Sequence, residues 1–183
     1  MTNNLLEKYL NKGITKFCVG SLNQAKEIKK ILPNAEITGS ITMHINKEKL
    51  EKNKEEYLQY FDFFVLDFTF NRDIDKIYNL PKDFKYILIV NTACNSNCPG
   101  DFHWFTNDYK NFNCPYEDKT SWWETSIINP LDLPLFDPYI SSYKIVERGF
   151  YTRTILTNIL LYNNFIGYFP DRQPNESLYK KRV

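Results

Sequence analysis

The chain has 183 residues and a formal net charge of +1. This length suits one buried core better than two ordinary domains, so we expect a single α/β domain over residues 1–183. The near-neutral charge argues against a broad electrostatic surface for nucleic acid or an anionic membrane. Hydrophobic residues make up 43% of the chain and aromatic residues 16%, which favours a packed globule over a disordered chain.

The first residues lack the basic-then-apolar order of a signal peptide, and no apolar run reaches the roughly 20 residues of a membrane span. We therefore expect a soluble, cytoplasmic protein that makes no membrane contact. Four cysteines in that compartment favour metal binding or catalysis over disulfides. The alternative for each cysteine alone is a small buried apolar residue.

In chain order, the apolar pattern first predicts a short helix over residues 5–10 and a strand over residues 14–20. Ser21 and Gln24 have the spacing of a capping box, which predicts a helix over residues 22–32. This first unit is therefore a strand, a tight turn and a helix.

The same cycle then repeats twice. Residues 36–45 are predicted as a strand and residues 47–60 as a charged amphipathic helix. Residues 62–68 form an apolar strand, after which Asp73 is predicted to cap a short helix. Residues 86–90 are a fourth buried strand.

A long segment over about residues 92–135 interrupts the cycle and is rich in Cys and Trp. A loop of this length inside a compact domain is usually functional. The order resumes with a strand over residues 143–147 and a helix over residues 152–162, before a polar tail from about residue 170. Strands that alternate with helices predict a mainly parallel sheet of about five strands with flanking helices.

The four cysteines can converge at one edge of such a sheet. Cys94 and Cys98 follow the fourth strand, Cys114 lies in the same long loop, and Cys18 lies near the end of the first strand. Ligand sites gather at the carboxyl ends of parallel strands. Four thiolates suit a [4Fe–4S] cluster, and they equally suit a tetrahedral Zn²⁺ site.

The cysteine spacing favours iron–sulfur, because structural zinc usually uses two close pairs and this chain has one C-x₃-C pair and two isolated cysteines. Cys18 alternates within a strand and can instead belong to the core, in which case His103 could complete the site. Radical S-adenosylmethionine proteins have a third cysteine in their loop, at the position where this chain has Asp101. That difference argues against radical chemistry.

The run from Cys94 to Phe105, CNSNCPGDFHWF, resembles the Cys-Pro…His-Phe signature of the collagenase-like peptidase family. Further short segments fall in the order that this family shows: Gly20–Ser21, Thr38–Ser40, Leu66–Asp73, Ile89–Asn91 and Tyr143–Arg148. The resemblance covers about residues 14–165. It implies a TIM-barrel-like fold and, as in several members, a [4Fe–4S] cluster that supports oxygen-independent hydroxylation in ubiquinone synthesis or of RNA bases.

The chain also departs from the family. It has Gly100 and Asp101 where an arginine is common after the Cys-Pro pair, and Glu147 where a glycine is common before the last arginine. These changes affect the expected substrate pocket more than the cluster. A full eight-stranded barrel takes about 250 residues, so this shortened chain is either a partly open barrel or part of a homo- or hetero-oligomer that completes one.

Other residues have two readings each. His103 could donate to the cluster or carry protons, or it could be a hydrogen-bonded loop residue. Arg148 could hold an anionic substrate group, or it could pair with Glu147 or Asp67. Asp73 is most simply a helix cap and Arg72 a surface charge, and the alternative for residues 71–73 is a role in the site.

Aromatic residues of the long loop could form a stacking platform for a flat ring or base, or they could be core; these are Tyr116, Trp122, Trp123 and Phe136. His44, at the end of the second predicted strand, is most simply structural. No persuasive protease site is present, since the chain has no H-E-x-x-H zinc motif and no assignable Ser-His-Asp set.

The sequence therefore predicts an iron–sulfur protein that modifies a small molecule or RNA, with His103 and Arg148 as candidate catalytic residues. One alternative is a non-catalytic module, stabilised by an iron–sulfur cluster or zinc, that pairs with a larger relative. Another is a peptidase, as the family is commonly regarded.

Overall fold

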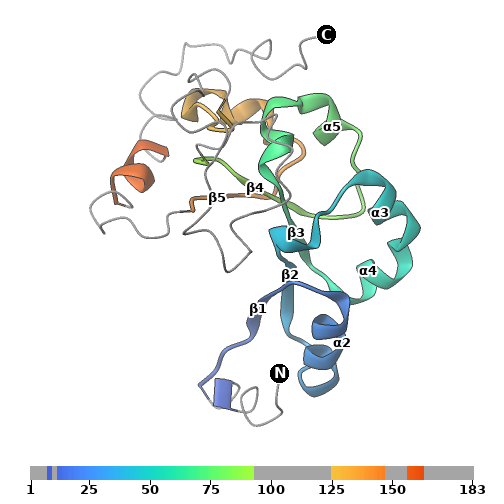
Figure 1. Ribbon diagram of the computed structural model, residues 1–183. Coiled ribbons are helices and arrows are strands. Elements are labelled where there is room, and N and C mark those ends of the chain that lie inside the picture. Colours follow the sequence, from blue (N-terminus) through green and yellow to red (C-terminus); the bar gives the residue numbers. More distant parts are fainter. Residues whose placement is uncertain (1–7, 10–11, 93–124, 147–155, 163–183) are drawn as a thin grey trace, which may run out of the picture. The chain divides into compact units, whose positions relative to one another are not determined.

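The fold comes from a computed structural model that describes residues 8–9, 12–92, 125–146 and 156–162 (Figure 1). Five strands form one parallel sheet whose order follows the chain: β1 (Lys16–Val19), β2 (Glu36–Gly39), β3 (Phe63–Leu66), β4 (Tyr86–Ile89) and β5 (Ser142–Lys144). Helices flank the sheet, so the predicted α/β class is confirmed. Closure into a TIM-barrel-like shape stays a prediction.

Short helices connect the strands, as the sequence pattern predicts. The α-helices are α2 (Leu22–Ile31), α3 (Lys47–Lys52), α4 (Lys54–Tyr60) and α5 (Ile74–Tyr78), with a further helix over residues 156–162. The 3₁₀ helices are η1 (Ile41–Met43), η2 (Phe68–Arg72) and η5 (Pro130–Leu135).

The predicted cap of α2 is confirmed. The Ser21 hydroxyl accepts a hydrogen bond from the Gln24 amide at 3.3 Å, and the Gln24 side chain accepts one from the Gly20 amide at 2.9 Å. One orphan donor of the first helical turn, the Gln24 amide, is thereby satisfied, and so is the Gly20 amide that precedes the cap.

Several predicted boundaries differ from the structure, and two of them have a clear polar cause. The strand expected over residues 36–45 ends at Gly39, because the Ser40 hydroxyl accepts from the Thr42 amide and starts η1. The helix expected over residues 47–60 is broken at Asn53, whose side-chain amide donates to the Lys49 carbonyl at 2.8 Å. Asparagine competes in this way for backbone groups that would continue a helix.

The chain divides into two compact units, which we describe separately. The first comprises Met1–Val65 with Leu80–Tyr86, and the second comprises Leu66–Asn79 with Ile87–Val183. The expectation of a single domain, which came from the chain length, stays a prediction.

An aromatic cluster forms the core of the first unit. The rings of Tyr57, Phe61 and Phe64 contact one another and the Phe84 ring contacts Phe64, with centroids between 4.9 and 5.6 Å apart in these four contacts. Gly39 lies against Phe64, and a Cβ at that position would come within 2.8 Å of the Phe64 Cε1 atom. Packing of the ring against β2 therefore requires glycine there.

The core of the second unit is aliphatic and aromatic. Its fully buried side chains include Leu66, Phe68, Ile74, Ile77, Leu88, Ile89, Ile128 and Phe136. Phe136 lies in the segment for which sequence allowed either a stacking platform or core, and its burial shows that it is core.

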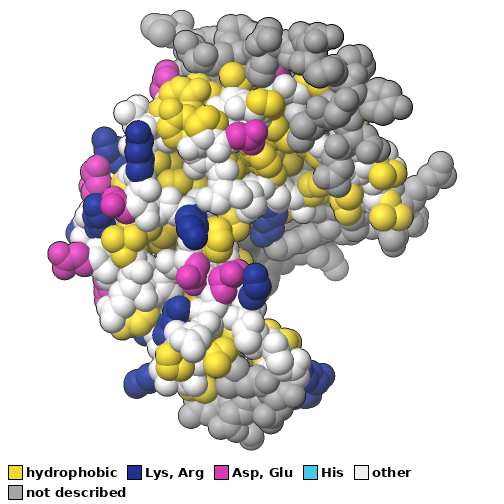
Figure 2. All heavy atoms as spheres, turned by 180° about the vertical axis from the view of Figure 1, so that it is seen from behind, with side chains coloured by type: hydrophobic (Ala, Val, Ile, Leu, Met, Phe, Trp, Pro, Cys, Tyr) yellow, Lys and Arg dark blue, Asp and Glu magenta, His cyan; other side chains and the backbone are white. Residues whose placement is uncertain are grey.

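Charges of both signs are mixed on the surface. On the face shown in Figure 2, lysine and arginine side chains are interspersed with aspartate and glutamate. Ion pairs in the first unit include Lys16 with Glu36 and Lys54 with Asp83. This pattern agrees with the near-zero net charge. Within the described ranges, none of the helices is both long and apolar enough to cross a membrane.

Candidate functional site

The candidate site is the carboxyl end of β4 in the second unit, where the chain enters and leaves the segment that holds three of its cysteines. The described chain stops at Thr92, three residues after β4, and resumes at Thr125. Residues on both sides of the gap are held to the same few side chains. We call Asn71, Arg72 and the carbonyl groups that they bind the Asn71–Arg72 clamp.

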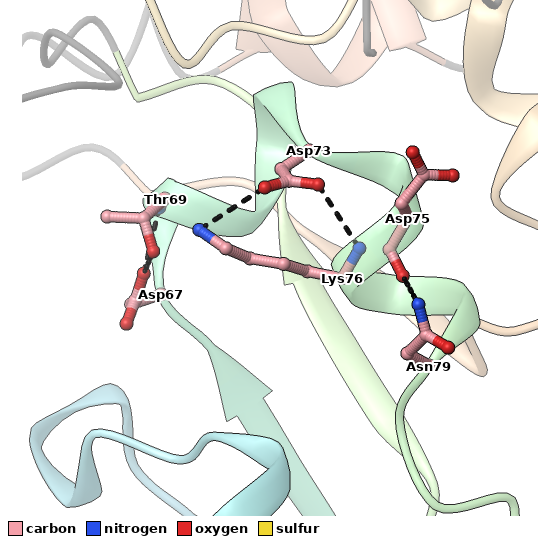
Figure 3. Close-up of polar contacts among 6 residues, drawn as sticks. All are labelled: Asp67, Thr69, Asp73, Asp75, Lys76 and Asn79. Atoms are coloured by element: carbon pink, nitrogen blue, oxygen red, sulfur yellow. Dashed lines mark hydrogen bonds and ion pairs between the residues drawn. The ribbon is translucent and has the colours of Figure 1, made fainter. Parts of the chain in front are cut away.

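The turn after β3 positions the clamp. Asp67 begins η2 by accepting a hydrogen bond from the Thr69 amide at 2.8 Å, and its carboxylate also accepts from the Thr69 hydroxyl (Figure 3). Asp73 ends η2 and caps α5, accepting from the Lys76 amide at 3.2 Å with the Lys76 ammonium 3.4 Å away. The predicted cap at Asp73 is confirmed. Asn71 and Arg72 are thus fixed between two capped turns.

Asn71 is completely buried, and its carboxamide bridges two parts of the chain that are far apart in sequence. Its Nδ2 donates to the Ile89 carbonyl at 2.6 Å and to the Ser126 carbonyl at 2.5 Å. Ile89 is the last residue of β4. One side chain therefore joins the end of that strand to the segment that returns from the cysteine-rich region.

Arg72 binds two further carbonyl groups of the segment to which Ser126 belongs. Its Nε donates to the Thr125 carbonyl at 2.6 Å, and its Nη2 donates to the Ile127 carbonyl at 2.8 Å. The side chain is half-buried, so the expectation that Arg72 is a surface charge is wrong. A planar guanidinium is suited to gripping two carbonyls of one strand-like segment.

Backbone and tyrosine hydrogen bonds hold the same two chain segments together beside the Asn71–Arg72 clamp. The Ile128 amide donates to the Val90 carbonyl at 2.9 Å, and the buried Tyr162 hydroxyl lies 2.8 Å from the Val90 carbonyl and 3.0 Å from the Ile128 carbonyl. Asn91 pairs with Val146 in both directions, donating to its carbonyl at 2.9 Å and accepting from its amide at 2.8 Å. The Asn91 side chain thereby extends the pairing of β4 with β5.

Two tyrosines of this unit hold their protons tightly. Burial raises the pKa of the Tyr162 phenol well above its ordinary value. Burial also raises the pKa of Tyr143, and the Asp137 carboxylate, which accepts its hydroxyl at 2.5 Å, raises it further. Both phenols are therefore hydrogen-bond donors near neutral pH.

Of the predicted cluster ligands, the structure describes only Cys18. It lies in β1, opposite Thr38 of β2, and its side chain is exposed. The remaining candidates lie outside the described residues: Cys94, Cys98, Cys114, His103 and Arg148. Tyr116, Trp122 and Trp123 lie outside them as well. His44 is exposed and follows η1 with a φ of 47°, in the left-handed region.

No group of three or more His, Cys, Asp or Glu side chains suited to a metal ion occurs within the described ranges. The aspartates after β3 are engaged as caps, as Figure 3 shows. The assignment of the cysteines as ligands therefore stays a prediction from their spacing.

Sequence reasoning missed the roles of Asn71, Arg72, Asn91 and Tyr162. Asn71, Arg72 and Asn91 share one signal, which is their position. Each lies within a few residues of the end of a buried strand, where polar side chains in α/β sheets gather. Their partners lie in distant segments, which a local pattern does not reveal.

No protein-family model, curated protein or solved structure matches the chain. The resemblance to the collagenase-like peptidase family accordingly rests on the short motifs alone.

Replacing Asn71 by alanine tests the clamp. We expect Asn71→Ala to lower the free energy of unfolding by at least about 2 kcal/mol, because two buried carbonyls each lose a donor. Urea unfolding measures this change, with Asn79→Ala as the matched control, since the exposed Asn79 side chain donates to the Asp75 carbonyl of its own helix at 2.7 Å. Equal losses for the two variants would contradict the bridging role.

The buried Tyr162 phenol predicts a loss of stability at high pH. Below about pH 10 the phenol is protonated in both the folded and unfolded chains, so its contribution is complete. Above that pH the unfolded chain releases the proton first, and stability falls by up to about 1.4 kcal/mol per pH unit for this group. In urea unfolding between pH 8 and 11, Tyr162→Phe should show a shallower fall than the parent chain; an identical slope would count against burial of the phenol.

Proposed function

We propose that the protein is an iron–sulfur protein whose cluster is held by Cys94, Cys98, Cys114 and Cys18. The observation that supports this most is that residues on both sides of segment 93–124, which carries three of these cysteines, are tied to the Asn71–Arg72 clamp. A cluster needs thiolates presented from a rigid base. The clamp is such a base at the carboxyl end of a parallel strand, where ligand sites gather.

Cys94, the first proposed ligand in segment 93–124, follows a well-fixed residue of the fold. Cys94 is two residues beyond Thr92, so the covalent chain keeps their Cα atoms within about 7 Å of each other. Thr92 itself is nearly buried, with 6% of its surface exposed. The first proposed ligand is therefore close to a fixed point of the fold.

Cys18 lies in β1, and its exposure leaves the thiol open to a ligand. In the sheet order, β2 and β3 separate its strand from β4. If Cys18 is not a ligand, His103 is the residue that would complete the site. Replacement of each residue separates these two possibilities.

The bound cluster would supply one-electron transfer. As the family resemblance implies, we propose that the protein uses it in oxygen-independent hydroxylation, or a related modification, of a small molecule or RNA. In this proposal His103 would carry a proton near neutral pH, and Arg148 would hold an anionic group of the substrate.

A non-catalytic, metal-stabilised module is the second candidate function. It is favoured by the sheet order within the described residues, where β1 and β5 each have one neighbouring strand. An edge strand can pair with another chain, here a second copy or a larger relative. Zinc in place of the cluster would agree with this second function.

Anaerobic purification tests the proposal. We expect a coloured protein with visible absorption, iron and acid-labile sulfide in equal amounts, and bleaching with loss of stability when a chelator removes the iron. Alanine at Cys94, Cys98 or Cys114 should abolish iron retention. A colourless chain with one zinc per molecule would contradict the cluster.

The fourth ligand needs its own comparison. Cys18→Ala should lose the cluster if Cys18 is a ligand, and His103→Ala should lose it if His103 completes the site. Thr38→Ala, opposite Cys18 in the sheet register, is the control for damage to the strand pair. Full iron content in both the Cys18 and His103 variants would contradict both assignments.

A further inference from the structure

The backbone of β1 presents hydrogen-bonding groups on the side that faces away from the sheet. The Thr15 and Val19 carbonyls accept hydrogen bonds from amides of the β2 segment at 2.9 and 2.7 Å. Backbone groups alternate sides along a strand, so the amides and carbonyls of Lys16 and Cys18 point away from β2. Among the described strands, none lies on that side of β1.

This edge of β1 is exposed. Thr15, Lys16 and Cys18 are all exposed, and β1 pairs with β2 residue by residue from Lys16 to Val19, without a bulge or a proline. A lysine can protect an edge strand, but the Lys16 ammonium lies 3.1 Å from the Glu36 carboxylate of β2, toward the sheet. Apart from its short length, β1 therefore lacks the usual protection of an edge strand.

A second copy of the chain can satisfy these groups by antiparallel pairing about a two-fold axis. Within β1, the two-fold registers that bring outward groups together are centred on Lys16, Phe17 or Cys18. The register centred on Lys16 places like charges directly opposite each other, which is destabilising. The register centred on Cys18 places Lys16 opposite Gly20, whose amide already donates to the Gln24 side chain at 2.9 Å.

The register centred on Phe17 avoids both problems. It places Lys16 opposite Cys18 of the second copy, so that each outward amide meets an outward carbonyl and a charged residue meets a neutral one. The half-buried Phe17 then lies opposite its symmetry mate in a non-hydrogen-bonded pair, where side chains lie close and aromatic pairs are stabilising. This self-complementarity favours a second copy over an unrelated strand.

We propose that the chain forms a two-fold dimer by antiparallel pairing of β1 with β1 of a second copy, centred on Phe17. The pairing uses the backbone of Cys18 and leaves its thiol available to a ligand. It gives the second candidate function a defined surface and does not depend on the proposed cluster. A contact between two short strands is small for a protein interface, so the dimer is weak and forms only at high concentration.

Proline at an outward position tests the pairing. Lys16→Pro removes an outward amide and leaves the groups of Thr15, Phe17 and Val19 that face β2 in place. Lys16→Ala is the matched control, because it removes the same side chain and keeps the amide. The measurement is sedimentation equilibrium of the full chain in reducing buffer, from micromolar to millimolar concentration.

We expect the parent chain and Lys16→Ala to dimerise with similar affinity, and Lys16→Pro to dimerise at least about tenfold more weakly, because the dimer loses a hydrogen bond from each copy. A parent chain that stays monomeric over this range overturns the proposal. Equal dimerisation of the two variants also overturns it.

Amide exchange on the parent chain is a second test, which does not depend on how the proline variant folds. The Lys16 and Cys18 amides should exchange rapidly in the dilute monomer, and their exchange should slow in proportion to the dimer fraction. A dimer in which both amides still exchange rapidly overturns the proposal. Neither measurement depends on iron content, so a negative result bears on the dimer alone.

Discussion

The hydrogen bonds of one buried carboxamide hold the second unit together at the end of β4. Asn71 donates to the last carbonyl of that strand and to the carbonyl of Ser126, and water has no access to either bond. A buried carbonyl without a donor is costly, so this side chain is needed where the regular strand pairing stops. Asn91 acts in the same way toward Val146. Two asparagines thus continue the pairing beyond the backbone ladder.

These hydrogen bonds fix the residues on both sides of segment 93–124, which carries the proposed chemistry. We call these fixed flanking residues, together with the Asn71–Arg72 clamp, the fixed base. The returning residues 125–128 are held by Asn71, by Arg72 and by the Val90 carbonyl. Functional groups in α/β proteins commonly lie on loops that a rigid scaffold positions. The proposed thiolate site at Cys94, Cys98 and Cys114 would follow that rule, since segment 93–124 starts and ends at the same base.

Local patterns predicted much of the fold. The five strands and the caps at Ser21 and Asp73 were predictable because apolar periodicity and capping act over a few neighbouring residues. The boundary at Gly39 and the break at Asn53 were missed, because each depends on a polar side chain that competes for nearby backbone groups. Arg72 was misread as a surface charge, since its partners Thr125 and Ile127 are more than fifty residues away.

Amide hydrogen exchange tests the fixed base most directly. The amides of Ile128 and Val146 donate to the Val90 carbonyl and to the Asn91 side chain. We predict that both amides exchange with the same opening free energy as the Val90 amide, which donates to the Lys144 carbonyl within the sheet. Rapid exchange at Ile128 and Val146, with Val90 still protected, would contradict it.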